Sequence, residues 1–457
     1  MATGKLDQTA PWYRGITRYQ WLVLIIASLG WVFDVFEGQI FVASMRDAMP
    51  ALLGASADSD LTIKWNDWAF GSFLLGGAFG GVLFGMLSDR IGRSKTMVIT
   101  ILFYSAFTCV TAFAQAPWQM VVLRFFVAMG VGGEWAVASA MVAEVMPKRS
   151  RAVMSSIFHA SSVFGTLLAA AAGAFIVGNS ALGDAAWRWG FAIGALPALL
   201  TLWVRWKLRE PDQWIKARDR AKKGTEYQTG RILELFQGPN LRSTLIGVSL
   251  SSIGLVTFWG GHIYGKNALL RHAQKQALLA ENITDKSTKE SKAAALEKHK
   301  SSIKQSEMLS MVLNTLGGGL GLVLFGTISN VLGRKGAFVL YHAVAFLMVL
   351  LLFEVLIAQE ASAFWLAVTL PIFGFFTLGM HAGYAVYFPE LYPTRLRGTG
   401  AGFCFNMGRL GTAAAFFIFG ALSVTSEDKA VMLAPLYLLG VIIVLFARET
   451  RDEELPD

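Results

Sequence analysis

The chain has 457 residues, of which 54% are hydrophobic and only 16% are charged, and its mean hydropathy is +0.50. A soluble protein of this size needs a larger polar surface, so the composition argues against a soluble enzyme and against disorder. Two cysteines are too few for a disulfide scaffold. The formal net charge of +9 fits either a membrane or a nucleic acid as partner until the charges are located.

Apolar segments long enough to cross a bilayer follow one another along the chain. A spanning helix needs about 20 mostly apolar residues. These runs are too long for transmembrane strands and do not alternate, so we expect helices. The sequence therefore predicts an all-α membrane protein with twelve transmembrane helices. The runs lie at 20–42, 68–88, 96–114, 118–144, 153–178, 187–206, 243–263, 307–329, 336–358, 363–388, 398–422 and 430–447.

The basic residues set the expected orientation. If the N-terminus is cytoplasmic and the helices alternate, 25 Lys and Arg fall on cytoplasmic segments and 4 in the short outer loops. This asymmetry follows the positive-inside rule. It predicts a multi-pass protein of the cell (inner) membrane with both termini in the cytoplasm. The positive charge is then a topology signal, and we expect no nucleic-acid partner.

Two long polar segments divide the chain. The segment 207–241 separates six apolar runs from six and is expected to be a cytoplasmic linker. The segment 264–306 has a charged, helix-favouring composition and is expected to be an external insertion, either a solvated spacer or a partner-binding element. We therefore expect an N-terminal six-helix bundle at 1–206 and a C-terminal bundle at 242–457.

Two short patterns occur once in each half. "GMLSDRIGRSK" at 85–95 matches "GTISNVLGRKG" at 326–336, and "AEVMPKRSRAVMSS" at 143–156 matches "PELYPTRLRGTGAG" at 389–402. Each copy lies at the corresponding cytoplasmic helix junction of its half. This arrangement predicts a parallel duplication of six helices, with a binding site near the bilayer midplane between the halves.

With these motifs the chain resembles the major facilitator superfamily of secondary transporters, whose loop signature matches Gly85-x-x-x-Asp89-Arg90-x-Gly92-Arg93. The resemblance implies alternating access and a gate at these loops; a charge cluster set only by topology is the alternative. Asp89 can accept from an arginine or from a helix N-terminus. The candidate gating residues are Gly85, Asp89, Arg90, Gly92, Arg93, Glu144, Arg151, Gly333, Arg334, Glu390 and Arg397.

The expected partners within this gate differ between the halves. Arg90 and Arg93 can pair with carboxylates at other helix ends, and Glu144 with Arg151 offers one such set. In the second copy Asn330 replaces the acid of the signature, so that half should be held less by charge. Its second pair would be Glu390 with Arg397.

Ionisable residues within the bilayer are costly and by default indicate function. Asp34 and Glu37 share one face of the first helix at i,i+3. Two carboxylates this close resist joint ionisation, so they are candidate proton-coupling residues together with Glu134. Helix rise places Asp34 and Arg124 at the same depth, which predicts an Asp34–Arg124 ion pair with Glu37 nearby.

Four residues are candidates for substrate binding: Arg124, His159, Asn406 and Arg409. Arg409 lies near the midplane of the eleventh run. A guanidinium there can bind a substrate carboxylate, pair with an acid of the other half or reach toward water at the membrane surface. His159 lies at the depth of Glu134, where it is a packing histidine, a proton relay or a substrate contact.

"GVGGEW" followed by "AEVMPKRSR", and "GRLG" in the eleventh run, resemble the sialate, aromatic-acid and related metabolite:proton symporter branches. That resemblance implies proton-coupled uptake of a small organic anion by a monomeric transporter, not an enzyme, with neither cofactor nor metal. The first run lacks the glycine of the acidic motif in these branches. "LREPDQW" at 208–214 resembles sugar porters, so a sugar or neutral-metabolite porter stays open. A transporter-like receptor whose insertion binds a partner is the other alternative.

Overall fold

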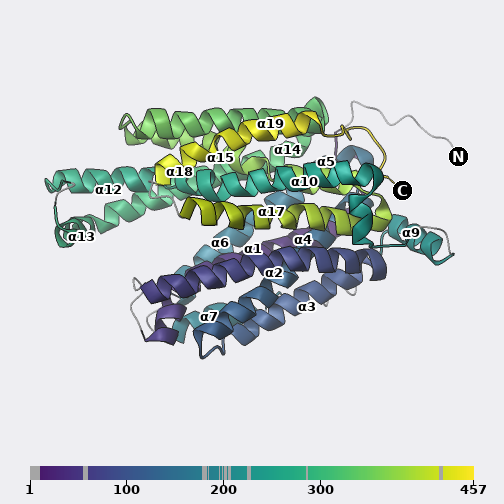
Figure 1. The fold of residues 1–457 in the computed structure, drawn as a ribbon, viewed down its shortest axis with the longest axis horizontal. Coiled ribbons are helices and arrows are strands. Elements are labelled where there is room, and N and C mark those ends of the chain that lie inside the picture. The colour runs from purple at the N-terminus through teal and green to yellow at the C-terminus, as the bar shows by residue number, and fades with distance from the viewer. Residues whose placement is uncertain are drawn as a thin grey trace.

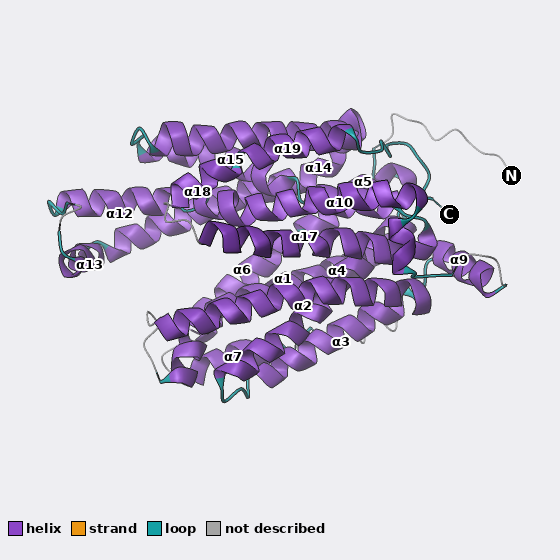
Figure 2. Cartoon of the chain, in the orientation of Figure 1, coloured by secondary structure: helices purple, strands orange, loops and turns teal. Residues whose placement is uncertain are grey.

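The computed structural model describes residues 11–54, 60–177, 183, 185–194, 196–197, 199, 203, 207–223, 228–284, 287–420 and 426–456. Every regular element in these residues is helical (Figure 2). The main helices are α1 (Arg18–Leu53), α2 (Asp60–Ile91), α3 (Arg93–Thr111), α4 (Pro117–Val145), α5 (Lys148–Ala160), α6 (Ser162–Ala172), α7 (Ala186–Ile193), α9 (Asp212–Lys222), α10 (Gly238–Thr257), α12 (Ala268–Ala280), α13 (Lys289–Lys298), α14 (Lys300–Leu350), α15 (Ala363–Gly379), α16 (Ala382–Tyr387), α17 (Arg397–Gly420), α18 (Ser426–Leu433) and α19 (Pro435–Leu445).

Short π- and 3-10-helical pieces join or extend these helices. The π-helical pieces are η1 (Gly173–Val177), η4 (Phe258–His262) and η5 (Leu351–Ile357), and the 3-10 pieces are η3 (Ile232–Phe236), η6 (Phe388–Leu391) and η7 (Thr394–Leu396); α11 (Ile263–Gly265) is a single α-helical turn. Local sequence signals explain several boundaries. At the start of α1, Thr17 Oγ1 accepts from Gln20 N at 3.2 Å and Gln20 Oε1 accepts from Thr17 N at 2.9 Å, which satisfies amide groups that an uncapped helix would leave unpaired.

Within the described residues, nine helical segments are long and apolar enough to cross a membrane. The segment Lys300–Ile357 contains two of the expected runs, because Gly333 breaks α14 with a φ of 82°. α17 coincides with the run expected at 398–422. The run expected at 187–206 lies partly outside the described residues.

Helices from the two halves of the chain meet along two seams. α2 packs against α17, and α5 packs against α14. Glycines permit both close approaches: a Cβ at Gly85 would lie 2.6 Å from the Gly398 carbonyl oxygen, and one at Gly326 would lie 2.3 Å from that of Ala152. In Figure 1 the purple-to-blue helices α1–α4 occupy the lower part, and the later helices α14, α15 and α19 the upper part.

The bundle has two different ends. α9 and the C-terminal residues lie at one end, called the linker end below, while α12 and α13 project at the opposite end, called the insertion end (Figure 1). In the insertion, Glu281 accepts from Lys298 at 2.9 Å and contacts His299 at 3.0 Å. These two hydrogen bonds hold the pKa of Glu281 below its ordinary value. The insertion is thus a helical hairpin in its described residues, as its helix-favouring composition predicts.

Candidate functional site: a linker-end network and a midplane cluster

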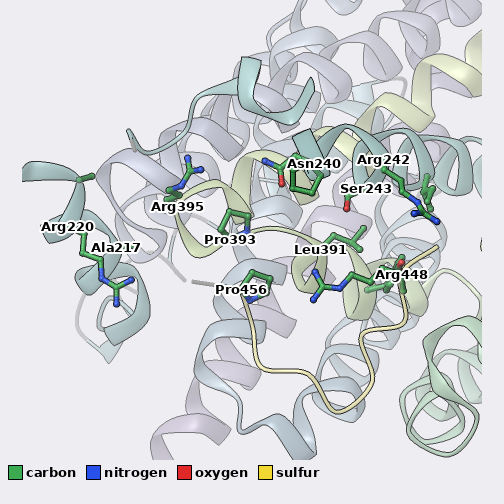
Figure 3. Close-up of a pocket in the computed structure, with 14 residues that line it drawn as sticks. Ala217, Arg220, Asn240, Arg242, Ser243, Leu391, Pro393, Arg395, Arg448 and Pro456 are labelled. Carbon is green, nitrogen blue, oxygen red and sulfur yellow. Dashed lines mark hydrogen bonds between the residues drawn. The ribbon is translucent and has the colours of Figure 1, made fainter. Parts of the chain in front are cut away.

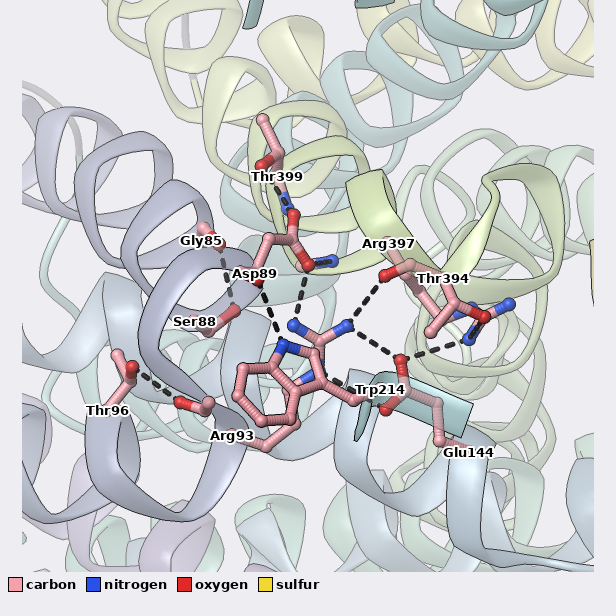
Figure 4. A network of polar contacts seen from close by, with 12 residues as sticks. Gly85, Ser88, Asp89, Arg93, Thr96, Glu144, Trp214, Thr394, Arg397 and Thr399 are labelled. Carbon is pink, nitrogen blue, oxygen red and sulfur yellow. Dashed lines mark hydrogen bonds and ion pairs between the residues drawn. The ribbon is translucent and has the colours of Figure 1, made fainter. Parts of the chain in front are cut away.

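Four buried charged residues form a network at the linker end: Asp89, Arg93, Glu144 and Arg397 (Figure 4). Arg93, the first residue of α3, lies 2.6 Å from Asp89 Oδ1 and 2.7 Å from Glu144 Oε1. Arg397 Nη1 of α17 lies 3.0 Å from the same Glu144 oxygen. Because Glu144 and Arg397 belong to different halves, the linker-end network joins the halves through charge-assisted hydrogen bonds.

Asp89 also caps a helix of the other half. Its carboxylate accepts from Gly398 N at 3.1 Å and from Thr399 N at 2.8 Å, both in the first turn of α17. The Thr399 hydroxyl donates to it at 2.5 Å. A carboxylate at a helix N-terminus is stabilised by the unpaired amide groups and the helix dipole. The linker residue Trp214 donates to the Asp89 carbonyl at 2.9 Å, which ties α9 to this corner (Figure 4).

The second copy of the loop signature makes its ion pair within the C-terminal half. Arg334 lies 2.9 Å from Glu390 Oε1 and donates to Asn330 Oδ1 at 3.1 Å. Glu390 also accepts from Thr450 Oγ1 at 2.6 Å. The contact between Thr450 and Glu390 therefore holds the C-terminal tail, residues 446–456, against the C-terminal half.

Three predicted partners of the gate are wrong. Arg151 does not pair with Glu144; its Nε donates to the Ala143 carbonyl at 3.1 Å. Glu390 does not pair with Arg397, because each has the partner described above. Arg90 donates to the Gly230 carbonyl at 3.3 Å rather than to a carboxylate. The sequence supplied the right residue types, but the choice of partner depends on how the two halves meet.

Two further acids at the linker end were missed by the sequence analysis. Glu210 accepts from Arg93 N at 2.6 Å, and Glu449 accepts from Arg334 N at 2.8 Å. Each caps the helix that follows a left-handed glycine, Gly92 with φ 119° or Gly333 with φ 82°. The signal was present in the sequence, because the two acids follow the last helices of their halves at corresponding positions.

Within the bilayer, Arg124 pairs with Glu37 and not with Asp34, which corrects the predicted pair. Arg124 Nη1 lies 2.8 Å from Glu37 Oε1, and Nη2 donates to Thr111 Oγ1 at 3.2 Å. Thr108 donates to the same Glu37 oxygen at 3.0 Å. Helix depth could not separate the two acids, since they lie three residues apart, about 4.5 Å along the axis.

Asp34 and Glu134 lie on facing helices, with hydrogen-bonding atoms that have no partner. Oε1 of Glu134 is buried and unpartnered. The Asp34 carboxylate and the Tyr104 hydroxyl are buried together and face each other as acceptor and donor, without the geometry of a full hydrogen bond. Oε2 of Glu134 accepts from Thr100 at 2.6 Å. Glu134 approaches α1 at Gly30, one turn before Asp34: a Cβ there would lie 2.7 Å from Oε1. Asp34, Tyr104 and Glu134 interact electrostatically.

Asn406 and Arg409 supply the other wall of this site from α17. Asn406 Oδ1 and Arg409 Nη1 are buried and unpartnered. Both face glycines of α2: a Cβ at Gly81 would lie 1.9 Å from Asn406 Nδ2, and one at Gly77 would lie 1.6 Å from Arg409 Nη1. Asp34 is the acid that interacts electrostatically with Arg409. Asp34, Tyr104, Glu134, Asn406 and Arg409 together are called the midplane cluster below.

His159 lies beside this cluster among aromatic rings. Its Nδ1 accepts from Trp135 Nε1 at 3.2 Å, and its ring centroid lies 5.4 Å from that of Trp31. Trp135 stacks on Phe405 of α17 with ring centroids 3.9 Å apart. The aromatic contact thus crosses between the halves, next to the polar residues. Of the predicted substrate residues, Asn406 and Arg409 belong to the midplane cluster, and His159 lies among the aromatic rings beside it. Arg124 pairs with Glu37 and lies outside the cluster.

This arrangement has the parts that alternating access requires. Buried carboxylates with unpaired oxygen atoms can take up and release protons if water reaches them, and a guanidinium with an unpartnered nitrogen can bind an anion. The linker-end network closes one side of the seam through its Glu144–Arg397 and Asp89–Thr399 contacts, which exist only when the halves meet there. Metal-ligand clusters of three or more His, Cys, Asp or Glu were not found in the described residues.

Comparison with known proteins agrees with this architecture. The profile of the family described as "Sugar (and other) transporter" matches residues 22–235. The solved structure of the proton:xylose symporter XylE, a major facilitator superfamily protein, superposes with a TM-score of 0.73 at 17% identity, covering 96% of this chain and 98% of that one. This likeness confirms the predicted fold class, an all-helical membrane protein of the major facilitator fold, for which twelve spans are expected.

Relatives of similar length are also transporters. The cis,cis-muconate transport protein of Acinetobacter baylyi is 29% identical over 83% of this chain and 85% of its own length. The sialic acid transporter NanX of Escherichia coli is 28% identical, with 88% and 87% covered. The niacin transporter NiaP of Acinetobacter baylyi is 26% identical, with 96% of each chain covered. The chain therefore adopts the major facilitator fold, and the proteins that it resembles over most of its length are membrane transporters rather than enzymes.

Proposed function

We propose that this transporter takes up a small organic anion together with protons, by alternating access between its two halves. The single observation that carries the proposal is Arg409, whose Nη1 is buried in the seam between α2 and α17 without a hydrogen-bond partner. An arginine in this position needs an anion to satisfy it. A substrate carboxylate would supply the two oxygens that a guanidinium binds best.

Proton coupling is assigned to Asp34 and Glu134. A buried carboxylate that has no ion pair and accepts at most one hydrogen bond is far cheaper to hold protonated than charged. Glu37 fits this role less well, because it is already neutralised by Arg124 at 2.8 Å. When the substrate and the protons leave, an ionised Asp34 would balance the positive charge of Arg409, so that the empty carrier can reorient.

The proposal also covers the orientation of the chain in the membrane and its division into two bundles and a linker. The linker end is cytoplasmic, both termini lie in the cytoplasm, and the insertion hairpin is external, as the distribution of basic residues predicts. The units are a bundle at 1–206, a linker at 207–241 and a bundle at 242–457, acting as a monomer. In this assignment the described conformation is closed to the cytoplasm, since the linker-end network is formed.

A sugar or neutral-metabolite porter is the second candidate. The description of the matching family and the xylose symporter among the structural relatives favour it. A comparison of substrates separates the two functions. Proteoliposomes with an alkaline interior are offered sialate, muconate, nicotinate or hexoses; accumulation of a carboxylate supports the proposal, and accumulation of hexoses alone contradicts it.

A further inference from the structure

A cavity of about 1150 Å³ opens at the linker end, apart from the midplane cluster. Its walls come from α9, from the start of α10, from the loop between α16 and α17 and from the C-terminal tail (Figure 3). The described lining contains no Asp or Glu and four arginines: Arg220, Arg242, Arg395 and Arg448. The transport cycle proposed above uses none of the four.

Two of the arginines, Arg242 and Arg448, have partners that leave their positive charge available to a ligand. Arg242 donates to the Phe446 carbonyl at 2.7 Å, a neutral acceptor that does not cancel its charge. Arg448 pairs with Glu453, but these side chains are 58% and 40% exposed, and exposed ion pairs are weak and readily exchanged. Arg395 is paired with Glu234. Arg448 is therefore the side chain most easily released to a ligand.

The start of α10 lies on the same wall and adds the positive end of a helix dipole. Pro239, Asn240 and Ser243 line the cavity within its first two turns, and the residue before the helix, Gln237, does not cap it through its side chain. The helix dipole favours an anion there. Arginines beside such a helix start provide the planar, bidentate donors that phosphate groups bind.

The cavity also spans the junction between the two halves. Arg220 belongs to the linker helix α9, which Trp214 ties to Asp89 of the N-terminal half at 2.9 Å and which also packs against η7 of the C-terminal half. The other three arginines belong to the C-terminal half; Arg242 and Arg448 lie on the opposite side of the cavity from Arg220, and Arg395 lies on the same side as Arg220 (Figure 3). Near the cavity, the carbonyl of Pro456 in the tail accepts from Arg397 Nη2 at 2.9 Å, next to the linker-end network.

From this geometry we propose that the cavity binds a phosphate-bearing anion, either a lipid headgroup or a free phosphate compound, which holds the linker end closed. A ligand that contacts Arg220 on one side and Arg448 or Arg242 on the other binds only while these walls are together. A ligand that binds one state better shifts the population toward that state. The bound anion therefore slows opening of the linker end, whatever substrate is transported.

The test uses the full chain in nanodiscs, with spin labels at Lys95→Cys and Val331→Cys, two exposed linker-end positions in different halves, in a Cys109→Ser background. In one arm, pyrophosphate is added to phosphatidylcholine discs, and its binding and the label distance are measured. In the other arm, phosphatidylglycerol replaces part of the lipid and no phosphate compound is added. The variants are Arg448→Gln alone and with Arg242→Gln. The matched control is Arg218→Gln, on α9 but outside the lining.

We expect one arm to increase the short-distance population, and the double substitution to weaken this response about tenfold in ligand concentration while Arg218→Gln leaves it unchanged. A response to pyrophosphate identifies a free phosphate compound, and a response to phosphatidylglycerol identifies a headgroup. The proposal is overturned if neither arm responds, or if Arg218→Gln weakens the response as much as Arg448→Gln. Because Arg448 is exposed, loss of folding does not obscure its single variant, and substrate uptake does not enter the readout.

Discussion

The carboxylate of Glu144 in the N-terminal half lies 3.0 Å from the guanidinium of Arg397 in the C-terminal half, and both side chains are buried. Glu144 is simultaneously 2.7 Å from Arg93. One carboxylate thus separates two arginines that would otherwise face each other without water. The contact is available only in the conformation closed at the linker end, so its strength helps to set how often that end opens.

Replacing this acid should open the linker end. Glu144→Gln keeps the shape of the side chain but removes the charge between two arginines, and removing one partner of a buried ion pair costs about 3–5 kcal/mol. We expect the labels at Lys95 and Val331 to move to longer distances and uptake to fall. Glu454→Gln is the matched control, because its 3.4 Å contact with Lys148 also joins the halves but is exposed. Equal distance distributions in the two variants would remove the linker-end network from the gating mechanism.

Adjacent glycines of α2 should separate gating from folding. A Cβ at Gly81 would lie 1.9 Å from Asn406 Nδ2 across the seam between halves, whereas one at Gly80 would lie 2.0 Å from the Met129 carbonyl within the N-terminal half. Overpacking costs about 1–3 kcal/mol. We expect Gly81→Ala to shift the spin-label distances with little change in the thermal midpoint, and Gly80→Ala to lower that midpoint. The opposite pattern would show that the α2–α17 seam does not move during transport.

Arg409 should determine the affinity for an anionic substrate. Arg409→Gln removes a hydrogen bond to a charged group, worth about 1.5–3 kcal/mol, so the substrate concentration for half-maximal uptake should rise about ten- to a hundredfold. Arg409→Lys keeps the positive charge but lacks the planar guanidinium. Its substrate concentration for half-maximal uptake should therefore lie between the values for the unmodified protein and for Arg409→Gln. The measurement is concentration-dependent uptake into proteoliposomes. Unchanged half-saturation in Arg409→Gln would favour a neutral substrate.

The two acids of α1 should give different defects when neutralised. Asp34→Asn cannot carry a proton, so we expect exchange of labelled for unlabelled substrate to persist while uptake against a gradient disappears. Glu37→Gln leaves buried Arg124 without its acid and should lower stability by about 3–5 kcal/mol, seen as a lower thermal midpoint. If Asp34→Asn still concentrates substrate as the unmodified protein does, another group carries the proton.

The fold was more predictable from the sequence than the site. Apolar runs of membrane length and the paired loop motifs indicated helices, duplication and the family resemblance, because these features depend on composition and local pattern. Partner choice within the site depends on rotation about helix axes. Asp34 and Glu37 lie on one face of α1, but only Glu37 points at Arg124.

The partners of the gating residues could not be predicted from the sequence either, because some of them belong to different halves of the chain. Sequence spacing favoured partners inside one half, such as Glu144 with Arg151, whereas Glu144 pairs across the seam with Arg397. No local pattern specifies how two bundles meet. The contact of Pro456 with Arg397 was also beyond prediction, since a backbone carbonyl in a tail carries no sequence signal.

Proton coupling to an organic anion is tested most directly by recording substrate and proton movement in the same proteoliposomes. Substrate is added outside without a membrane potential, while external pH and internal substrate are followed together. The account predicts that a carboxylate entering the vesicles makes the external solution more alkaline, and that Asp34→Asn abolishes this change. Carboxylate uptake with no accompanying proton movement would contradict it.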